Sequence, residues 1–411
     1  MIDFTLTPQM KMARDMLHSI MEKEVRPLAL QADRDAAYPD SLYKKLAPLA
    51  AAMGGGGGAK PAGGGKAGAG AGMSMKNMAL LAVVAGEELG WGDPSISLVM
   101  PGPGTGGPAL AARGTEAQKE KYFGMLQGRE PRWAAYGLTE PGTGSDAAAI
   151  RTRCRKEGDE YVINGRKCYI SNGARAEWTL VFATTDPALG HAGHRVFIVE
   201  KDTPGFEVGK IEDKLGFRAS ETAELVFDEC RVPAANLLGG EEAYVGGEKA
   251  GFKTAMEFFD TSRPLVGIMA VGIARAAFEE LQSFVLDNYL LSRPIPRYQL
   301  LADRLADLKR KIDAARLLCW KAAWMADNGL RNTKEASMSK LYGPQVGMEV
   351  TSAAVQLMEM HGTAKGTLSE KLFRDVKVFD IFEGTHQIQQ MVVARNMFDR
   401  VRLSTSGEVL H

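Results

Sequence analysis

The residues with the clearest chemical potential lie near the C-terminus, in the run Asp-Ile-Phe-Glu-Gly-Thr-His-Gln-Ile-Gln-Gln at 380–390. Glu383 and Gly384 predict a turn just before a helix, which would hold the carboxylate of Glu383 on a short, defined segment. A carboxylate in such a position can act as a general base. Taken alone, the motif also fits an ordinary exposed glutamate in a loop.

A second candidate segment covers residues 136–146 and reads Tyr-Gly-Leu-Thr-Glu-Pro-Gly-Thr-Gly-Ser-Asp. Its glycines allow the backbone to turn sharply and approach a ligand closely. Its hydroxyl and N–H groups can donate to anionic or carbonyl oxygens. The segment therefore predicts a ligand-binding loop, with a turn-rich connector as the alternative interpretation.

The elements that must position these segments begin with helices. Residues 5 to about 130 predict mainly helix, because apolar residues such as Met10, Leu17 and Ile20 recur near helical spacing. The segment 54–72, made of Gly, Ala, Lys and Pro, predicts a surface loop. A phosphate-binding loop is disfavoured there, because neither the GxxxxGK[ST] order nor a preceding strand is present.

From about Trp133 to Leu238 the hydrophobic period changes to two, which predicts a compact antiparallel β-domain. Residues 160–170 predict two short strands joined by a hairpin turn at Asn164-Gly165, the dipeptide most typical of such turns. Further strands are expected at 179–184, 194–200 and 222–227.

After Gly251 the pattern is helical to the end of the chain. Leu301, Leu305 and Leu308 alternate spacings of four and three, which is typical of a long bundle helix. Pro264 falls inside an otherwise helical stretch and predicts a kink. We therefore expect an α+β protein of three domains: helical at 1–132, β at 133–240 and a helical bundle at 241–411.

Length and charge limit the possible functions. A chain of 411 residues with 45% hydrophobic residues can bury a large core. Lys+Arg and Asp+Glu are equal at 50 each, so no global field favours nucleic acid or an anionic membrane. No stretch approaches the roughly 20 apolar residues of a membrane span, so no span is expected.

The four cysteines, Cys154, Cys168, Cys230 and Cys319, are scattered and form no CxxC pair. This spacing suits a reducing compartment and argues against a disulfide framework or a metal site. The start of the chain has an acidic residue at position 3 and no basic-then-apolar run, so a secretory signal is not expected. A cytoplasmic location follows.

The segment 136–146 closely resembles the Tyr-x-x-Thr-Glu-Pro-x-x-Gly-Ser-Asp stretch of the acyl-CoA dehydrogenase family. Three further stretches agree in order and spacing: Asn-Gly-x-Lys-x-Tyr-Ile-Ser-Asn-Gly at 164–173, Asp-x-Ser-Arg-Pro at 260–264 and Phe-Glu-Gly-Thr-x-Gln-Ile-Gln at 382–389. The similarity spans about residues 5–400. It implies an α-helical N-terminal domain, a middle antiparallel β-barrel-like domain and a C-terminal four-helix bundle, with FAD between the domains.

The resemblance implies FAD-dependent conversion of an acyl-CoA to a trans-2-enoyl-CoA, as in fatty-acid β-oxidation. Glu383 would remove the weakly acidic α-proton, and the flavin would take the β-hydrogen as hydride. Burial beside the acyl chain should raise the pKa of Glu383. Some family members carry the base near residues 260–263, but Ser262 stands there in this chain, which favours the loop position.

The resemblance also assigns contacts residue by residue. Those implied for FAD are Tyr136, Leu138, Thr139, Ser145, Tyr169, Ser171, Gln299, Gln356, Thr385 and Gln387. Those implied for the acyl-CoA are Ser145, Asp260, Arg263, Phe382 and Gly384. A structural ion pair remains the alternative for Asp260 and Arg263. The floor of the acyl pocket is expected near Leu98, Val99, Met100 and Phe259.

Two motifs of the family are altered. Where many members have Arg-x-x-Phe-Gly, whose Arg reaches the FAD of a neighbouring subunit, this chain has Asn-Tyr-Leu-Leu-Ser-Arg at 288–293. Arg293 or Arg297 could substitute. After Gln356, Glu-Met-His-Gly at 359–362 replaces a Gly-Gly-x-Gly run. His361 and His386 fit hydrogen-bonding or surface roles better than catalysis.

These alterations fit a branch that assembles with a paralogue as an α2β2 tetramer, and a homotetramer is the alternative. The implied electron acceptor is an electron-transferring flavoprotein. Two other functions remain open: a non-catalytic or half-site subunit of a mixed tetramer, and a flavin-dependent acyl-CoA oxidase.

Overall fold

A computed structural model describes residues 4–51, 77–128, 130–245, 250–288 and 299–404. Side chains are described except at 250–261 and 399–404. The predicted loop at 54–72 and the two arginines at 293 and 297 lie outside these ranges, and so do the side chains of Asp260 and Phe259.

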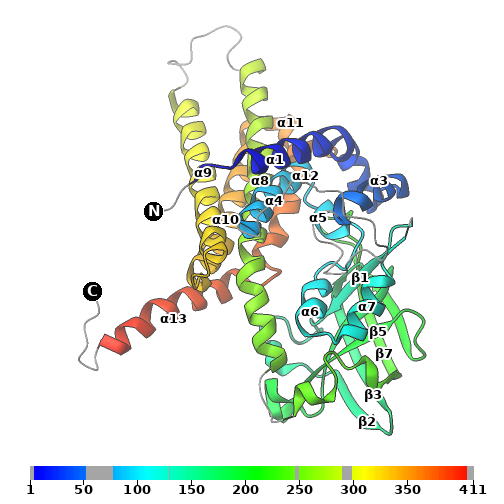
Figure 1. Cartoon of the computed structure of the whole chain (residues 1–411). Coiled ribbons are helices and arrows are strands. Elements are labelled where there is room, and N and C mark those ends of the chain that lie inside the picture. The colour runs from blue at the N-terminus through cyan, green and yellow to red at the C-terminus, as the bar shows by residue number, and fades with distance from the viewer. Residues whose placement is uncertain (1–3, 52–76, 129, 246–249, 289–298, 405–411) are drawn as a thin grey trace.

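The chain runs through helices, a curled sheet and helices again, as the sequence predicted (Figure 1). In the N-terminal part the helices are α1 (Pro8–Ile20), α2 (Ala29–Asp35), α3 (Asp40–Ala50), α4 (Met78–Gly92), α5 (Ile96–Val99), α6 (Gly106–Arg113) and α7 (Glu116–Gly124). In the C-terminal part they are α8 (Ala250–Asn288), α9 (Gln299–Asp327), α10 (Thr333–Leu357), α11 (Glu359–Thr363), α12 (Leu368–Asp375), the short 3-10 helix η9 (Val376–Asp380) and α13 (His386–Ser404).

The middle part is one sheet of seven strands. They are β1 (Trp133–Gly137), β2 (Arg153–Glu157), β3 (Glu160–Ser171), β4 (Ala176–Thr184), β5 (His194–Glu200), β6 (Phe206–Ile211) and β7 (Thr222–Pro233). Their order is β1-β4-β2-β3-β7-β6, with β5 also on β4. The expectation of a wholly antiparallel sheet was wrong: β1 and β2 both pair with β4 in parallel. The long connections from these strands to β4 permit that direction, which a short hairpin does not.

The expected hairpin at Asn164-Gly165 was also wrong. The turn between β2 and β3 falls earlier, at Gly158, whose φ is 61°. Asn164-Gly165 lies inside β3 as a bulge, and both halves of that strand pair with β7, for example at Ile163 and at Gly165. An added Cβ at Gly165 would come within 2.6 Å of the Thr152 hydroxyl, so the position needs a glycine to admit the neighbouring strand.

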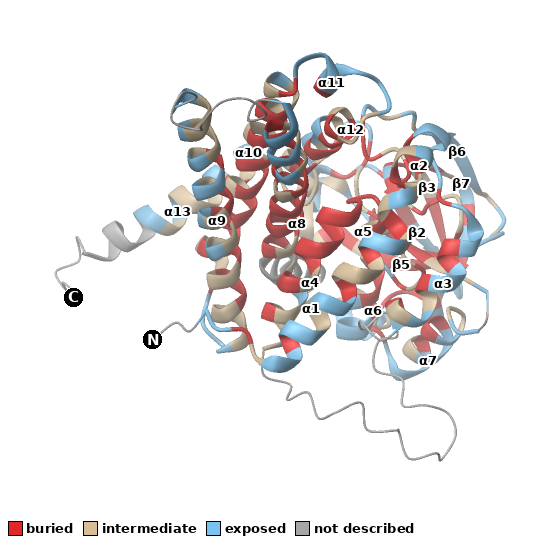
Figure 2. Cartoon of the chain, turned by 90° about the horizontal axis from the view of Figure 1, so that it is seen from above, coloured by how far each residue is buried: buried red, intermediate tan, exposed pale blue. Residues whose placement is uncertain are grey.

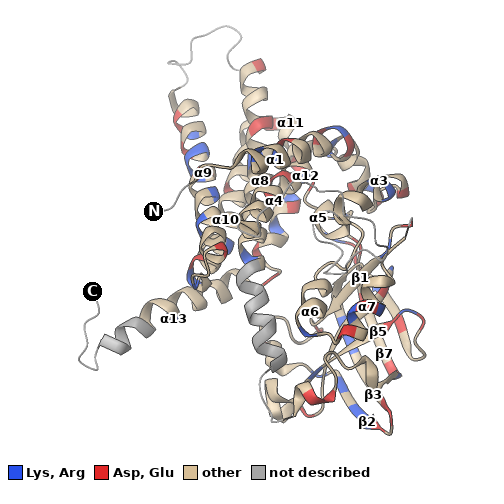
Figure 3. Ribbon diagram, viewed as in Figure 1, with Lys and Arg blue, Asp and Glu red and all other residues tan. Residues whose placement is uncertain are grey.

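Helices α8, α9 and α10 stand side by side, and α4 packs against α8, so the two helical parts share one core (Figure 2). Of the stripe predicted for α9, Leu308 is buried and Leu301 and Leu305 are partly buried, and the stripe continues in the buried Ile312 and Ala315. Helix α8 continues through Pro264. Acidic and basic residues are interspersed along α9 (Figure 3). The Lys311 ammonium there lies 2.8 Å from Glu349 on α10.

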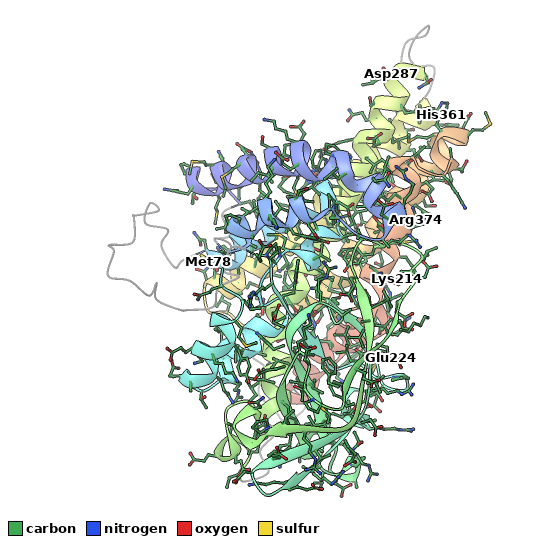
Figure 4. The ribbon with its side chains drawn as sticks, turned by 90° about the vertical axis from the view of Figure 1, so that its right-hand side faces the viewer. Met78, Lys214, Glu224, Asp287, His361 and Arg374 are labelled. Atoms are coloured by element: carbon green, nitrogen blue, oxygen red, sulfur yellow. The ribbon has the colours of Figure 1, made fainter. Side chains whose placement is uncertain are left out.

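A buried ion cluster joins α12 to the rest of the fold. Lys371 lies 3.0 Å from Asp93 and also pairs with Asp375, which accepts a hydrogen bond from the backbone N–H of Phe217. Next to it, Arg374 donates to the carbonyl of Leu215 at 2.9 Å, beside Lys214 where the helices meet the sheet (Figure 4). The cluster fixes the start of η9, the segment that leads to Glu383.

Candidate active site

The segment after η9 turns Glu383 toward the helical core. Glu383 and Gly384 have φ values of 57° and 92°, so two successive residues are left-handed before α13 begins. The half-buried carboxylate accepts a hydrogen bond from the Ser262 hydroxyl on α8, at 3.1 Å. A non-glycine residue in this conformation is strained and persists only where its surroundings hold it, as is common at functional sites.

The environment of Glu383 makes it a stronger base than an exposed glutamate. Burial raises its pKa, against the opposing effects of the Ser262 hydrogen bond and of the positive charges of Lys340 and Arg263. This is the direction that the sequence predicted. The carboxylate therefore combines an accessible edge with an affinity for protons that suits proton abstraction near neutral pH.

Tyr136 faces the same space from the end of β1. Its ring packs against Phe182, with centroids 5.0 Å apart. Burial raises the pKa of Tyr136, and the negative charge of Glu383 raises it further, so the phenol stays neutral. The next residues, Leu138 and Thr139, are partly accessible. The sequence-predicted loop and the predicted base thus approach each other from different parts of the fold.

A buried ion pair supports that loop. The Lys167 ammonium, inaccessible to solvent, donates to Glu140 at 2.7 Å and to the carbonyl of Leu138 at 3.2 Å. Glu140 also accepts from the backbone N–H groups of Arg151 and Thr152, at 2.6 and 3.0 Å. The pKa of Glu140 is lowered because these donors outweigh burial, whereas burial dominates for Lys167 and lowers its pKa to about 8.

A cavity of about 480 Å³ opens between α9, α10, the end of η9 and the start of α13. Its lining offers amide, imidazole, phenol and ammonium donors together with two carboxylates. The residues are Lys311, Tyr342, Gln345, Val346, Met348, Glu349, Asp380, His386 and Gln387. Thr385 caps α13, since its hydroxyl accepts from the N–H of Ile388 at 3.3 Å. Of the two residues predicted to meet the dinucleotide, Gln387 lines this cavity and Thr385 lies two residues before it.

Several predicted contacts do not line this cavity. Gln299 begins α9 twelve residues before Lys311, about 18 Å away along the helix, and Gln356 lies about 16 Å beyond Gln345 on α10. Both side chains are exposed. Ser145 is exposed in the loop that follows β1.

The predicted contacts on β3 lie in the last residues of that strand, which runs between β2 and β7. Tyr169 is 65% exposed and has a φ of 58°, within a bulge of β3. Ser171, at the end of the strand, is partly buried. A planar ligand resting against the end of β3 would have an aromatic ring and a hydroxyl within reach.

The residues predicted to contact the substrate occupy different depths. Arg263 is buried and donates to the Ser337 hydroxyl at 3.5 Å, so it lies inside the helical core. Phe382 packs on Phe379, with ring centroids 5.1 Å apart. Gly384 lies close to Gln389, which donates to its carbonyl at 3.1 Å. An added Cβ at Gly384 would come within 2.4 Å of that amide.

The expected acyl pocket and the altered motifs also have defined surroundings. Val99 is fully buried, and its carbonyl accepts from the Trp133 indole at 2.9 Å.

Asn288 stands where a cation was expected and donates to the carbonyl of Phe284. His361 packs on the Phe284 ring, at 5.2 Å, and His386 lies 3.2 Å from Asp380.

Sequence reasoning missed Lys340, Tyr342, Gln345 and Lys311. A signal was present for Lys340: it shares a helical stripe with Ala336, Gly343 and Gly347, the small residues that mark the buried face of α10. The sequence gives no comparable signal for Tyr342 and Gln345, because they line the cavity only through the contact of α13 with α10.

The described parts of the chain hold neither a metal-binding cluster of acidic, His or Cys side chains nor a helix fit to span a membrane. No group of three or more His, Cys, Asp or Glu side chains there is arranged to hold a metal ion. None of the helices there combines the length and apolarity needed to cross a membrane.

Comparisons with known proteins point in one direction. The family models described as acyl-CoA dehydrogenase N-terminal, middle and C-terminal domain match residues 7–129, 135–230 and 249–398. Over 401 residues the chain is 38% identical to the acryloyl-CoA reductase (NADH) of Anaerotignum propionicum, with 97% of each chain covered. It is 36% identical over 408 residues to the short-chain-specific acyl-CoA dehydrogenase of Clostridium acetobutylicum, covering 97% of this chain and 100% of that one. The structure of butyryl-CoA dehydrogenase from Megasphaera elsdenii matches with a TM-score of 0.82 and 34% identity, over 97% of this chain and 100% of the other.

Proposed function

Because the chain belongs to the acyl-CoA dehydrogenase family, a family of FAD-dependent oxidoreductases, we propose that Glu383 is the base that removes the α-proton of an acyl-CoA thioester. One observation carries the assignment. The Glu383 carboxylate sits on a left-handed turn, is hydrogen-bonded to Ser262 and faces Tyr136 across the junction of sheet and helices. The product is the trans-2-enoyl-CoA.

The residues present fit FAD. The cavity at α13 offers Lys311, Gln345 and Gln387 as donors, and the N-terminus of α13 adds the partial positive charge that favours phosphate. Tyr136, Leu138, Thr139, Tyr169 and Ser171 would hold the ring system, with Thr385 and Gln387 at the dinucleotide. When bound, FAD supplies the electron sink that takes up the β-hydrogen as hydride.

The protein's own residues supply placement and proton transfer. Burial makes the Glu383 carboxylate more basic, and the hydrogen bond from the Ser262 hydroxyl favours its ionised form and orients it for the α-proton. Phe382 and the buried Val99 provide apolar surface, which limits water around the reacting carbons. Gly384 would lie against the substrate, with Ser145, Asp260 and Arg263 toward the CoA portion.

For the substrate we propose a short acyl-CoA, supported by the short-chain and butyryl relatives. A second function is reduction of an enoyl-CoA, favoured by the 38% identity to a protein named acryloyl-CoA reductase. Dehydrogenation and reduction run in opposite directions and use the same residues, since protonated Glu383 would return the α-proton in the reductive direction.

Electron-transferring flavoprotein is the proposed partner, and the assembly is a homotetramer or an α2β2 tetramer with a paralogue. The exposed positions of Gln299 and Gln356, far from the cavity, support contact with a dinucleotide held by a neighbouring subunit. The four cysteines are free and buried, which supports a cytoplasmic location. We place the domain limits at 1–132, 133–240 and 241–411, supported by the change to strand at Trp133 and back to helix at Ala250.

The decisive experiment compares the purified chain with its Glu383→Gln variant, using straight, branched and ring-bearing acyl-CoA thioesters with a dye acceptor. We expect the variant to keep yellow flavin and acyl-CoA binding and to lose nearly all dehydrogenation. Glu359→Gln is a matched control, since Glu359 is an exposed glutamate with a similar φ of 52°. Turnover by Glu383→Gln would reject the base assignment. Peroxide formation with oxygen would indicate an oxidase, and a colourless chain that gains flavin only with a second chain would indicate the mixed tetramer.

A further inference from the structure

Lys340 is a buried lysine close to the proposed base. It is 1% exposed, and its ammonium has no direct hydrogen-bond partner among the residues that the structure describes. Burying an ammonium group is unfavourable unless nearby negative charge compensates. A lysine in this position therefore needs anionic neighbours to remain charged.

The packing of α10 brings Lys340 to the level of the site. Gly343 and Gly267 let α10 and α8 touch, since a Cβ added at Gly343 would come within 2.4 Å of the Gly267 carbonyl. Four residues earlier on α8 and six residues earlier on α10, Arg263 reaches Ser337. Lys340 lies between these two contacts, on the same buried face of α10.

Further along the same helix, α10 also contacts the segment that leads to the base. Gly347 lies against Val376 of η9, and Tyr342 and Gln345 share a cavity lining with Asp380. The groups whose charges act on the Lys340 ammonium are accordingly Asp380, Glu383 and Arg263. Two of the three are carboxylates, and one of these is the proposed base.

We propose that Lys340 is a positioning residue whose buried ammonium, one turn along α10 from the Ser337 that Arg263 reaches, keeps the Glu383 carboxylate ionised for proton abstraction. The proposal rests on the proposed function, because it takes Glu383 as the base. It adds a cation, supplied by α10, that no sequence motif identified.

The charges around Glu383 decide the expected direction. Facing it are Ser262 and Arg263 from α8, Lys340 from α10 and the phenol of Tyr136 from β1. Asp380 of η9 faces Lys340 and is paired with His386 of α13. Lys340 and Arg263 are the two cations whose fields favour the ionised carboxylate. Burial lowers the pKa of Lys340 to about 8, so its charge is present at neutral pH.

Removing that charge should raise the pKa of Glu383. A raised pKa leaves less carboxylate at a given pH, so the acid limb of the kcat/KM profile moves to higher pH. Each unit of displacement lowers kcat/KM about tenfold at a pH on that limb. At pH values above the acid limbs of both the wild type and the variant, the loss of kcat/KM should be much smaller.

The test uses the flavin-loaded enzyme and its Lys340→Met, Lys340→Gln and Lys340→Arg variants. Glu383 is titrated directly as the infrared difference between each protein and its Glu383→Gln counterpart, alongside the kcat/KM profile. We expect the midpoint of the Glu383 titration to rise to higher pH in Lys340→Met and Lys340→Gln. In Lys340→Arg it should stay near the wild-type value. Lys334→Met, a partly exposed lysine on the same helix, controls for the loss of one positive charge.

The outcomes separate the two assignments. An unchanged midpoint in Lys340→Met, with Glu383→Gln inactive, overturns the role of Lys340 and leaves the base in place. Full activity of Glu383→Gln overturns the base instead. If Lys340→Met fails to fold, Lys340→Gln gives the same comparison with a side chain that can form hydrogen bonds.

Discussion

The Ser262 hydroxyl on α8 donates to the Glu383 carboxylate at 3.1 Å, across a separation of 121 residues. This hydrogen bond joins the longest helix to the left-handed turn before α13. It favours the ionised form of Glu383, whereas burial favours the neutral form. The balance between these two effects sets the pH range in which the carboxylate can take a proton.

Replacing Ser262 by Ala should shift that range. Losing a donor to the ionised carboxylate raises the pKa of Glu383, so the acid limb of kcat/KM should move to higher pH. Activity should fall on the acid side and change little on the alkaline side. Ser339→Ala is the control, because the buried Ser339 hydroxyl donates to the Ala336 carbonyl and not to Glu383. Equal pH profiles for Ser262→Ala and the wild type would show that the hydrogen bond does not tune the base.

The pair of Glu140 and Lys167 should be essential for stability and for the loop at Leu138 and Thr139. Glu140→Gln leaves Lys167 buried without its counter-charge, which costs about 3–5 kcal/mol. Because the pKa of Glu140 is lowered in the folded state, the contribution of its charge is fully present above its ordinary value of 4.5. That contribution is lost as the pH falls through the folded-state pKa.

Urea unfolding of the wild type and Glu140→Gln between pH 7 and pH 3 measures both effects. The difference in the free energy of unfolding between the wild type and Glu140→Gln should be large near neutral pH and should become smaller below pH 4.5. The double variant Glu140→Met with Lys167→Met should recover part of the stability lost by Glu140→Gln, since no unpaired charge remains. A gap that does not change with pH would contradict the assignment to ionised Glu140.

The sequence was sufficient for the order of helices, sheet and helices, and for the position of Glu383 at a glycine turn. It failed at Asn164-Gly165, because that dipeptide marks a hairpin only when the strand has no partner beyond it. Here β7 pairs with β3 on both sides of the dipeptide, and this long-range ladder overrides the local turn preference. The same dependence on distant pairing explains the parallel strands next to β4.

Only part of the site could be predicted from the sequence, because the rest depends on contacts between distant segments. Tyr136 and Thr385 belong to continuous motifs that can be recognised along the chain. Lys340, by contrast, would ordinarily indicate an exposed helix face. Its burial follows from the close contact of α8 with α10, which depends on Gly267 and Gly343 in separate helices. The stripe of small residues around Lys340 marks a buried face of α10, but the sequence does not say which distant segment this face contacts.

The contact of α4 with α8 should be equally sensitive to one methyl group. A Cβ at Gly272 would lie 2.2 Å from the Glu87 carbonyl and 2.8 Å from the Trp91 nitrogen, both backbone atoms of α4 that cannot move alone. Gly272→Ala must therefore separate the two helices, at a cost of about 1–3 kcal/mol or more. The ion pair of Glu87 with Arg275, 2.9 Å at the same contact, would be strained by that movement.

Thermal unfolding of Gly272→Ala against Gly124→Ala measures this effect with the same chemical change. Gly124 ends α7, and an added Cβ there would meet nothing within 4 Å, so its replacement should leave the Tm unchanged or slightly raised. Gly272→Ala should lower the Tm by several degrees. Equal Tm values for the two variants would mean that α4 and α8 can separate freely. In that case the N-terminal helices could not hold α8, and with it Ser262, in a fixed position against the base.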